Sequence, residues 1–164
     1  MARSTFPASL REILSHEGGY CEHAGGRMNL GVTQTAYEAW VKHPVTEKIM
    51  RGLTPDHVRA LYRSNFWDAV RGDDLPIGVD LCVFDRAVCD TPHGAATALQ
   101  RIVGADADGV VGAETLEAVR EYARKSGISH LIDAYQDSRH GTARARVGAV
   151  RHAAKAMTRA GVAA

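Results

Sequence analysis

The most apolar part of the chain, residues 77–88, constrains the fold more than any other segment. Pro76 precedes it, and four consecutive apolar residues, 81–84, leave it no polar face. A helix that is apolar all round must be buried, because no side of it can face water. We therefore expect this segment to form a central helix that the rest of the chain covers.

Apolar residues at helical spacing recur through most of the remaining chain. Leu10, Ile13 and Leu14 form the first stripe, and later stripes follow Thr54-Pro55 and Thr91-Pro92, which are typical helix starts. No strand pattern of any length appears, and the only candidate β element lies in the glycine-containing stretch after Glu17. The sequence predicts a mostly α fold with a small loop or β-hairpin after the first helix.

Composition is that of a globular protein that buries a core. The chain has 164 residues, of which 45% are hydrophobic and 24% charged. No apolar run is long enough to cross a membrane, and the first ten residues lack the apolar segment of a secretory signal. Three cysteines at irregular spacing suggest reduced thiols, so we expect synthesis in a cytosol, and a protein that works outside it would need another system for its release.

Charge is distributed unevenly along the chain. Residues 120–164 contain nine Lys/Arg and three Asp/Glu (9 − 3 = +6), and the other 119 residues contain 11 and 16 (11 − 16 = −5). Such a basic C-terminus indicates an anionic wall or membrane partner, or else a solvated helix face. We expect no nucleic-acid partner, because no aromatic residues cluster beside these charges.

Glu17 lies in the run His16-Glu17-Gly18-Gly19-Tyr20, where the first predicted helix should end. A carboxylate at a helix end, followed by two glycines and an aromatic residue, can project into a cleft and act as a general acid. The local run alone favours a different interpretation, in which Glu17 is a surface residue before a glycine helix stop.

Two more carboxylates, Asp80 and Asp85, lie within the apolar central segment. A buried carboxylate is costly unless it is paired or functional. Structural pairing with Arg86 or Arg71 is the default expectation, and a functional role is the alternative.

The chain shows no recognisable metal or cofactor motif. The eight histidines include no pair with the spacing of a zinc site, and the run from Asp106 to Gly109 lacks the ligand spacing of a calcium loop. We expect neither a metal nor a cofactor.

An ordered series of short motifs resembles glycoside hydrolase family 108 and covers about residues 8–122. The motifs are Glu17-Gly18-Gly19-Tyr20, Gly25-Gly26, Asn29-Leu30-Gly31-Val32-Thr33, Phe66-Trp67-Asp68, Asp74-Leu75-Pro76 and residues 79–85. Leu99-Gln100, residues 108–112 and Thr115 then resemble the peptidoglycan-binding segment that usually follows. The resemblance implies a lysozyme-like helical fold, with a catalytic lobe at residues 1–95. A peptidoglycan-binding lobe with a basic tail would follow at residues 96–164 and pack with the first as one unit.

The family resemblance implies an N-acetylmuramidase of the kind found in phage endolysins and in wall-opening enzymes that help secretion. Glu17 would be the general acid. Outside the resemblance, Glu22 on the loop is a candidate for the base or electrostatic stabiliser, and the alternative is that the site has no second group. The expected substrate-binding residues are Tyr20, Asn29, Thr33, Gln34, Asp80 and Asp85. For Asn29 and Thr33 the alternative is turn and helix-cap duty.

The loop after Tyr20 departs from the family pattern. Members typically have an Asp-Pro-Gly-Gly run followed two residues later by Thr, whereas this loop is about three residues shorter. It has His23-Ala24 before Gly25-Gly26, and Met28 stands in place of the Thr. The resemblance therefore carries over only Glu17 as a catalytic residue.

Two alternative functions follow from this departure. A single glutamate suffices for a lytic transglycosylase, in which the substrate's own groups do the second job and an anhydro sugar is formed. A non-catalytic wall-binding or secretion-accessory protein would keep the fold and lose turnover. In each case peptidoglycan is the expected partner of a monomer that acts in the periplasm or wall, after release by a holin or a secretion system.

Overall fold

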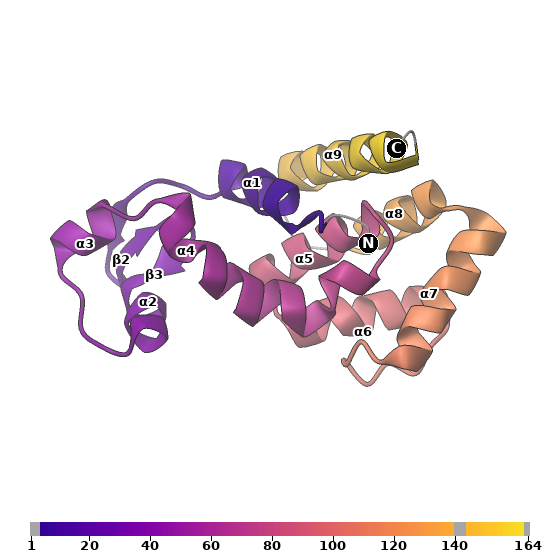
Figure 1. The fold of residues 1–164 in the computed structure, drawn as a ribbon, viewed down its shortest axis with the longest axis horizontal. Helices are drawn as coiled ribbons and strands as arrows, with labels where there is room; N and C mark the ends of the chain where they lie inside the picture. The colour runs from indigo at the N-terminus through magenta and orange to yellow at the C-terminus, as the bar shows by residue number, and fades with distance from the viewer. Residues whose placement is uncertain (1–3, 140–143, 163–164) are drawn as a thin grey trace.

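Helix α5 (Val79–Cys89) lies at the centre of the molecule in the computed structural model, which describes residues 4–139 and 144–162. Eight of its 11 residues are buried. Helices α1, α6, α8 and α9 all pack against it, and Figure 1 shows them surrounding it. The prediction of a central buried helix is confirmed.

Helices make up most of the described chain, and their bounds follow the predicted stripes closely. The α-helices are α1 (Phe6–His16), α2 (Gln34–Val41), α3 (Glu47–Arg51), α4 (Pro55–Tyr62), α5, α6 (Pro92–Val103), α7 (Ala113–Ser126), α8 (Ile128–Asp137) and α9 (Arg144–Val162). A π-helical turn, η1 (Arg63–Trp67), and two short 3₁₀ turns, η2 (Asp68–Val70) and η3 (Gly72–Asp74), connect α4 to α5. None of the described helices is both long and apolar enough to cross a membrane.

A small antiparallel sheet follows α1, as the sequence predicts. Strands β1 (Cys21–His23) and β2 (Gly26–Asn29) form the hairpin, and β3 (Val32–Thr33) pairs with β2 as a third strand. The sheet, α2 and α3 form a small lobe on the left of Figure 1, which we call the hairpin lobe, residues 20–51. The mostly α fold with a β-hairpin after the first helix is therefore confirmed, and the third strand extends it.

Aromatic packing joins α1 and η1 to the central helix. The Phe84 ring lies 5.3 Å from the Trp67 ring and 5.9 Å from the Phe6 ring, measured between centroids. Tyr62 contacts Phe84 edge-on from the end of α4. Tilted and edge-to-face aromatic pairs of this kind add to the stabilisation from burial alone. They fix the first helix, and hence its C-terminal end, against the core.

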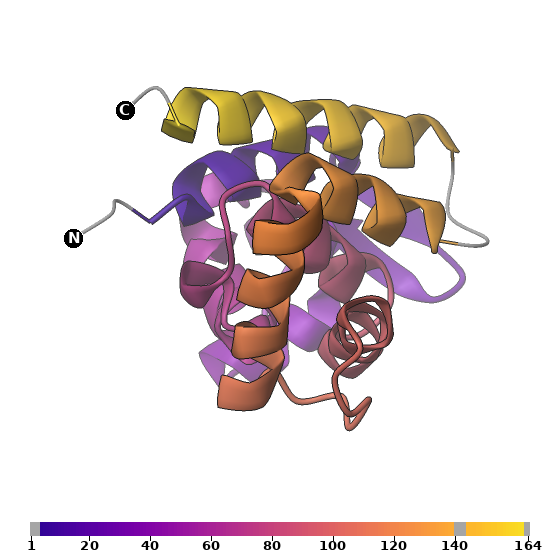
Figure 2. The same ribbon diagram turned by 90° about the vertical axis from the view of Figure 1, so that its right-hand side faces the viewer.

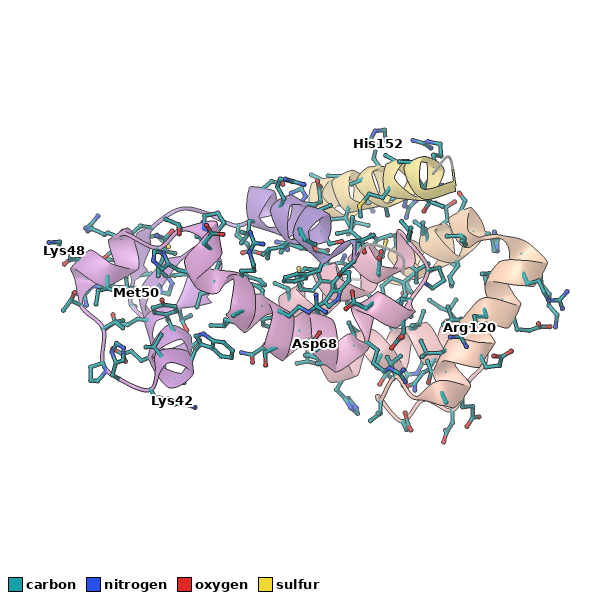
Figure 3. The ribbon with its side chains drawn as sticks, viewed as in Figure 1. Lys42, Lys48, Met50, Asp68, Arg120 and His152 are labelled. Atoms are coloured by element: carbon teal, nitrogen blue, oxygen red, sulfur yellow. The ribbon has the colours of Figure 1, made fainter. Side chains whose placement is uncertain are left out.

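The C-terminal helix α9 returns over the first half of the chain. It packs on α8, α5 and α1, and Figure 2 shows it running beside α8. Lys155 Nζ lies 2.7 Å from Asp133 Oδ2, and Arg151 Nη2 lies 2.5 Å from Asp137 Oδ1, so two basic residues of α9 pair with α8. Other residues, such as His152, point away from the body (Figure 3). The basic C-terminus is therefore partly a structural element of the core.

Candidate active site

Glu17 is the residue at which α1 ends and the chain turns into the hairpin lobe. Its backbone is extended, with φ −83° and ψ 146°. Gly18 and Gly19 are not among the glycines with positive φ, so the helix does not end in the left-handed glycine stop that the local run suggested. The Glu17 side chain is 18% exposed, which places its carboxylate at the edge of the interior.

The two carboxylate oxygens of Glu17 face different groups. Arg146 Nη1 on α9 donates a hydrogen bond to Oε1 at 2.9 Å. Oε2 faces Gly31, where a Cβ atom would lie only 2.8 Å from this oxygen. Gly31 has a φ of +75°, which favours glycine, and the missing side chain leaves room for the carboxylate.

Tyr62 closes the same corner of the site. Its hydroxyl donates to the Leu30 carbonyl at 2.8 Å, and a Cβ on Gly31 would lie 2.5 Å from that hydroxyl. Burial raises the pKa of Tyr62, and the nearby negative charge of Glu17 raises it further. The phenol therefore serves as a neutral donor that fixes the turn beside Glu17.

Arg146 belongs to a chain of alternating charges that leads from Glu17 into the core. Its Nε donates to Asp85 Oδ1 at 2.9 Å, and Nη1 of Arg139 donates to the other Asp85 oxygen. Burial lowers the pKa of Arg146, but the charge of Asp85 and hydrogen bonds to Asp85 and Glu17 outweigh burial and raise it. Glu17, Arg146, Asp85 and Arg139, which we call the buried network, join α1, α5 and α9 to the end of α8.

A cavity of about 210 Å³ is lined in part by Gly31 and Tyr62, the two residues next to Glu17, whereas Glu17 itself is not part of the lining. The cavity also contains polar and aromatic groups that the sequence motifs did not assign to a site, Asn65 and Phe66. Its lining consists of Gly31, Val32, Thr33, Ala36, Leu61, Tyr62, Asn65, Phe66 and Val88. A concave, largely apolar surface with a few polar groups next to a carboxylate is the usual form of a substrate site.

The predicted sugar contacts Asn29, Thr33 and Gln34 make hydrogen bonds that hold the hairpin lobe together. Asn29 is buried and donates to the Met50 carbonyl at 2.8 Å, and Figure 3 marks Met50 within this lobe. Thr33 accepts from the Ala36 amide at 3.1 Å and caps α2. Gln34 donates to the Val45 carbonyl at 2.9 Å. Of the three, Thr33 also lines the cavity, whereas Asn29 serves as a clamp.

Tyr20 and Glu22 meet each other at the surface of the hairpin lobe and do not contact Glu17. The Tyr20 hydroxyl donates to Glu22, Arg27 Nε lies 3.2 Å from the same carboxylate, and the Arg51 guanidinium lies 4.0 Å above the Tyr20 ring. The bonds from Tyr20 and Arg27 lower the pKa of Glu22. The structure thus does not bring the predicted second catalytic residue to the predicted acid.

Asp80 and Asp85, the other two predicted substrate contacts, are buried and do not line this cavity. Asp85 is fully buried between two arginines, neither of which is the predicted Arg86 or Arg71. Asp80 is 1% exposed and accepts from Thr5 and from two backbone amides at the start of α5, both at 2.7 Å. Burial raises the pKa of Asp80 to about 6, in spite of these bonds.

The residues that depart from the family pattern occupy ordinary hairpin positions. His23 Nδ1 accepts from the Gly25 amide at 3.1 Å and closes the turn. Met28 lies in β2, opposite Cys21 on one side and Thr33 on the other. Neither position supplies a carboxylate or hydroxyl to Glu17.

Sequence reasoning missed Arg146, which is 129 residues from Glu17 along the chain and 61 from Asp85. One signal pointed toward it. Two acids within an apolar helix require partners, and the C-terminal stretch carries an excess of arginine. Nothing in the spacing indicates which arginine is used, because the pairing depends on how α9 folds back.

The structure combines a mostly helical body, a β-hairpin after the first helix and a glutamate at the junction between them. The family model for glycosyl hydrolase 108 matches residues 10–90. The solved structure of Brucella abortus SagA is similar, with a TM-score of 0.77 and 38% identity over 96% of this chain and 98% of that chain. No curated protein matches. The chain belongs to glycosyl hydrolase family 108.

Proposed function

We propose that the protein is an N-acetylmuramidase that cleaves the glycan strand of peptidoglycan, with Glu17 as the general acid. One observation carries this proposal. Oε2 of Glu17 faces Gly31, which lines the cavity beside it, while Oε1 is held by Arg146. Glycosidic cleavage requires a carboxylic acid directed at the leaving oxygen.

The two carboxylate oxygens of Glu17 would have different roles during catalysis. Oε1 accepts from Arg146 throughout, so Oε2 is the oxygen that would carry the proton and give it to the glycosidic oxygen. As the bond breaks, the sugar becomes oxocarbenium-like and Glu17 becomes a carboxylate. Arg146 would stabilise that carboxylate by the charge-assisted bond that it already makes.

The same geometry leaves the second catalytic role to the substrate or to Glu17 itself. Glu22 is bound by Tyr20 and Arg27 on the hairpin surface, and Asp85 is buried. A single acid that later acts as a base supports the lytic-transglycosylase alternative, in which an anhydro sugar replaces the reducing end. Hydrolysis would require Glu17 to activate a water after it has released its proton.

Replacement of Glu17 by Gln tests the assignment, and the products distinguish the alternatives. We expect Glu17→Gln to lower the clearing rate of a wall suspension by about 10²-fold or more, whereas Glu22→Gln should retain most of the activity. Clearing by Glu17→Gln at the wild-type rate would rule out Glu17 as the general acid. Mass spectrometry of the digest separates reducing ends, made by a muramidase, from anhydro sugars, made by a transglycosylase.

The ion pair between Arg146 and Glu17, with no second carboxylate at the site among the described residues, also favours a non-catalytic wall-binding protein as a second candidate. That protein would sediment with purified sacculi and release no glycan. Endolysin-type lysis and action on the wall after release through a holin or secretion system remain parts of the muramidase proposal. Clearing of cells only after their inner membrane is permeabilised would support them.

A further inference from the structure

The π-helical turn η1 contains two residues that are anchored in the body and two that line the cavity of about 210 Å³. Trp67 is fully buried and its indole Nε1 donates to Asp73 at 3.1 Å, and Arg63 pairs with the same carboxylate. Asn65 and Phe66, which lie between these anchors, line the cavity. A π-helical turn inserted into a helix is frequent at functional sites. This turn therefore holds Asn65 and Phe66 at the cavity.

Asn65 is the polar side chain of the cavity that is not used elsewhere in the described part of the chain. It is exposed and forms no hydrogen bond with the described residues. By contrast, the Thr33 hydroxyl accepts from the Ala36 amide, and the Tyr62 hydroxyl donates to the Leu30 carbonyl. The side-chain amide of an asparagine offers N–H donors and a carbonyl acceptor. Asn65 is therefore free to bind a group that has one acceptor and one donor.

The rest of the lining selects against charge. None of the lining residues is charged, and Val32, Leu61 and Val88 supply aliphatic surface. The Phe66 ring packs 5.6 Å from the Tyr62 ring, measured between centroids. A charged group would lose water in this cavity without gaining a counter-charge. The volume of about 210 Å³ is also below the range of about 300–1,000 Å³ that is usual for a whole ligand, so an uncharged substituent suits it better than a complete sugar.

Gly31 connects the cavity to Glu17. A Cβ atom on Gly31 would lie 2.8 Å from Glu17 Oε2 and 2.5 Å from the Tyr62 hydroxyl, and both Gly31 and Tyr62 line the cavity. A substituent in the cavity would thus belong to a sugar that lies close to the carboxylate. Both sugars of peptidoglycan carry an acetamido group on the carbon next to the anomeric carbon. That group has a carbonyl acceptor, an N–H donor and an apolar methyl.

We propose that this cavity is the subsite for the acetamido group of the sugar beside the cleaved bond, and that Asn65 determines specificity for that group. The Asn65 amide donates to the acetamido carbonyl or accepts from its N–H, and the methyl contacts Phe66 and the aliphatic wall. The proposal rests on the proposed function, since the ligand is the glycan of peptidoglycan. A sugar with a free amine in place of the acetamido group loses these bonds and brings a charge into an uncharged cavity.

Binding of two short glycans to Glu17→Gln tests the subsite without turnover. NMR titration compares the trimer of N-acetylglucosamine with the trimer of glucosamine, which has free amines. We expect the acetylated trimer to bind at least about tenfold more tightly. Adding Asn65→Ala should weaken the acetylated trimer by about tenfold and leave the amine trimer unchanged. Ser64→Ala is the matched control, because Ser64 is an exposed neighbour in the same turn that does not line the cavity.

Asn65→Asp offers a test in the opposite direction. Its carboxylate would attract the charged amine, so the preference should shift toward the glucosamine trimer at mildly acidic pH. On purified walls, Asn65→Ala should raise KM with little change in kcat, as expected for a residue that only binds substrate. Because Asn65 is exposed, these variants should keep the Tm of the wild type, which circular dichroism checks.

The proposal is wrong if the two trimers bind equally, if the acetylated trimer does not bind, or if Asn65→Ala binds it as well as Ser64→Ala does. Failure of the proposed function gives a different result. An Asn65-dependent preference for the acetylated trimer, together with wall clearing by Glu17→Gln at the wild-type rate, would reject Glu17 as the acid and support the subsite. The same preference in a wild-type protein that releases no glycan would support a wall-binding protein with this subsite.

Discussion

The hairpin lobe and the helical body each contain a network of two acids and two arginines, but they place it in opposite environments. In the hairpin lobe, Glu22, Arg27, Glu47 and Arg51 form a surface network in which every side chain is between 37% and 57% exposed. In the body, the buried network of Glu17, Arg146, Asp85 and Arg139 has exposures of 0% to 18%. Networks with the same number of acids and arginines therefore lie at the surface in one region and in the interior in the other.

The exposure of its side chains decides how much each network contributes to the stability of the protein. Surface ion pairs add little stability, because water and salt screen the charges and pairing costs the long side chains conformational entropy. A buried pair contributes little net stability against an apolar replacement, yet the loss of one partner is costly because it strands a charge in the core. The buried network thus fixes the position of Glu17 and α9, whereas the surface network adds little to the stability of the hairpin lobe.

Removal of the central acid of the buried network should have the largest effect. Asp85→Ala leaves Arg139 without its ion-pair partner and should destabilise the protein by about 3–5 kcal/mol. Glu47→Ala removes the corresponding acid of the surface network and should leave the denaturation midpoint nearly unchanged. Urea unfolding of the two variants and the wild type measures the difference. If both variants lose the same stability, burial does not separate the two networks.

The sequence predicts the positions of the helices better than the partners of the polar side chains. Helix positions and the central role of α5 follow from apolar spacing, because these signals are local. The position of Glu17 at the end of α1 also follows, from the run of residues around it. The partners of Glu17 and Asp85 do not, since Arg146 reaches both only after α9 has packed across the first half of the chain. The hydrogen bonds of Asn29 and Gln34 do not follow either, because the sequence does not reveal which backbone carbonyl will lie near a polar side chain.

The pH dependence of stability sharpens the comparison, because Asp80 in the body and Glu22 in the hairpin lobe shift in opposite directions. Burial raises the pKa of Asp80 from 3.8 to about 6, so folding is favoured by the protonated form. This contribution is complete below about pH 4 and is lost as pH rises through 6, a change of about 3 kcal/mol. The pKa of Glu22 is lowered, so its contribution is lost instead as pH falls.

Asp80→Asn should therefore flatten the stability profile between pH 4 and 6 relative to the wild type. Asparagine is nearly isosteric, and its amide oxygen can still accept from the Gly78 and Leu81 amides. Denaturation at a series of pH values gives the difference curve, with Glu22→Gln as the matched variant from the other lobe. A difference curve for Asp80→Asn that stays level across this window would show that its charge is not suppressed by burial.

Gly31→Ala, at the point where the two regions meet, should have a backbone cost that is smaller than the effects at Asp85 and Asp80. The φ of +75° costs an alanine about 1–2 kcal/mol, and the new Cβ would lie 2.8 Å from Glu17 Oε2. Gly18→Ala is the control, because its Cβ would meet nothing within 4 Å and its φ is not positive. If the hairpin lobe only covers the site, the wall-clearing activity of Gly31→Ala will fall only as much as its fraction of folded protein falls. Because the new Cβ would meet both the Tyr62 hydroxyl and the oxygen proposed to carry the proton, we expect clearing to fall far more than folding, while Gly18→Ala retains both.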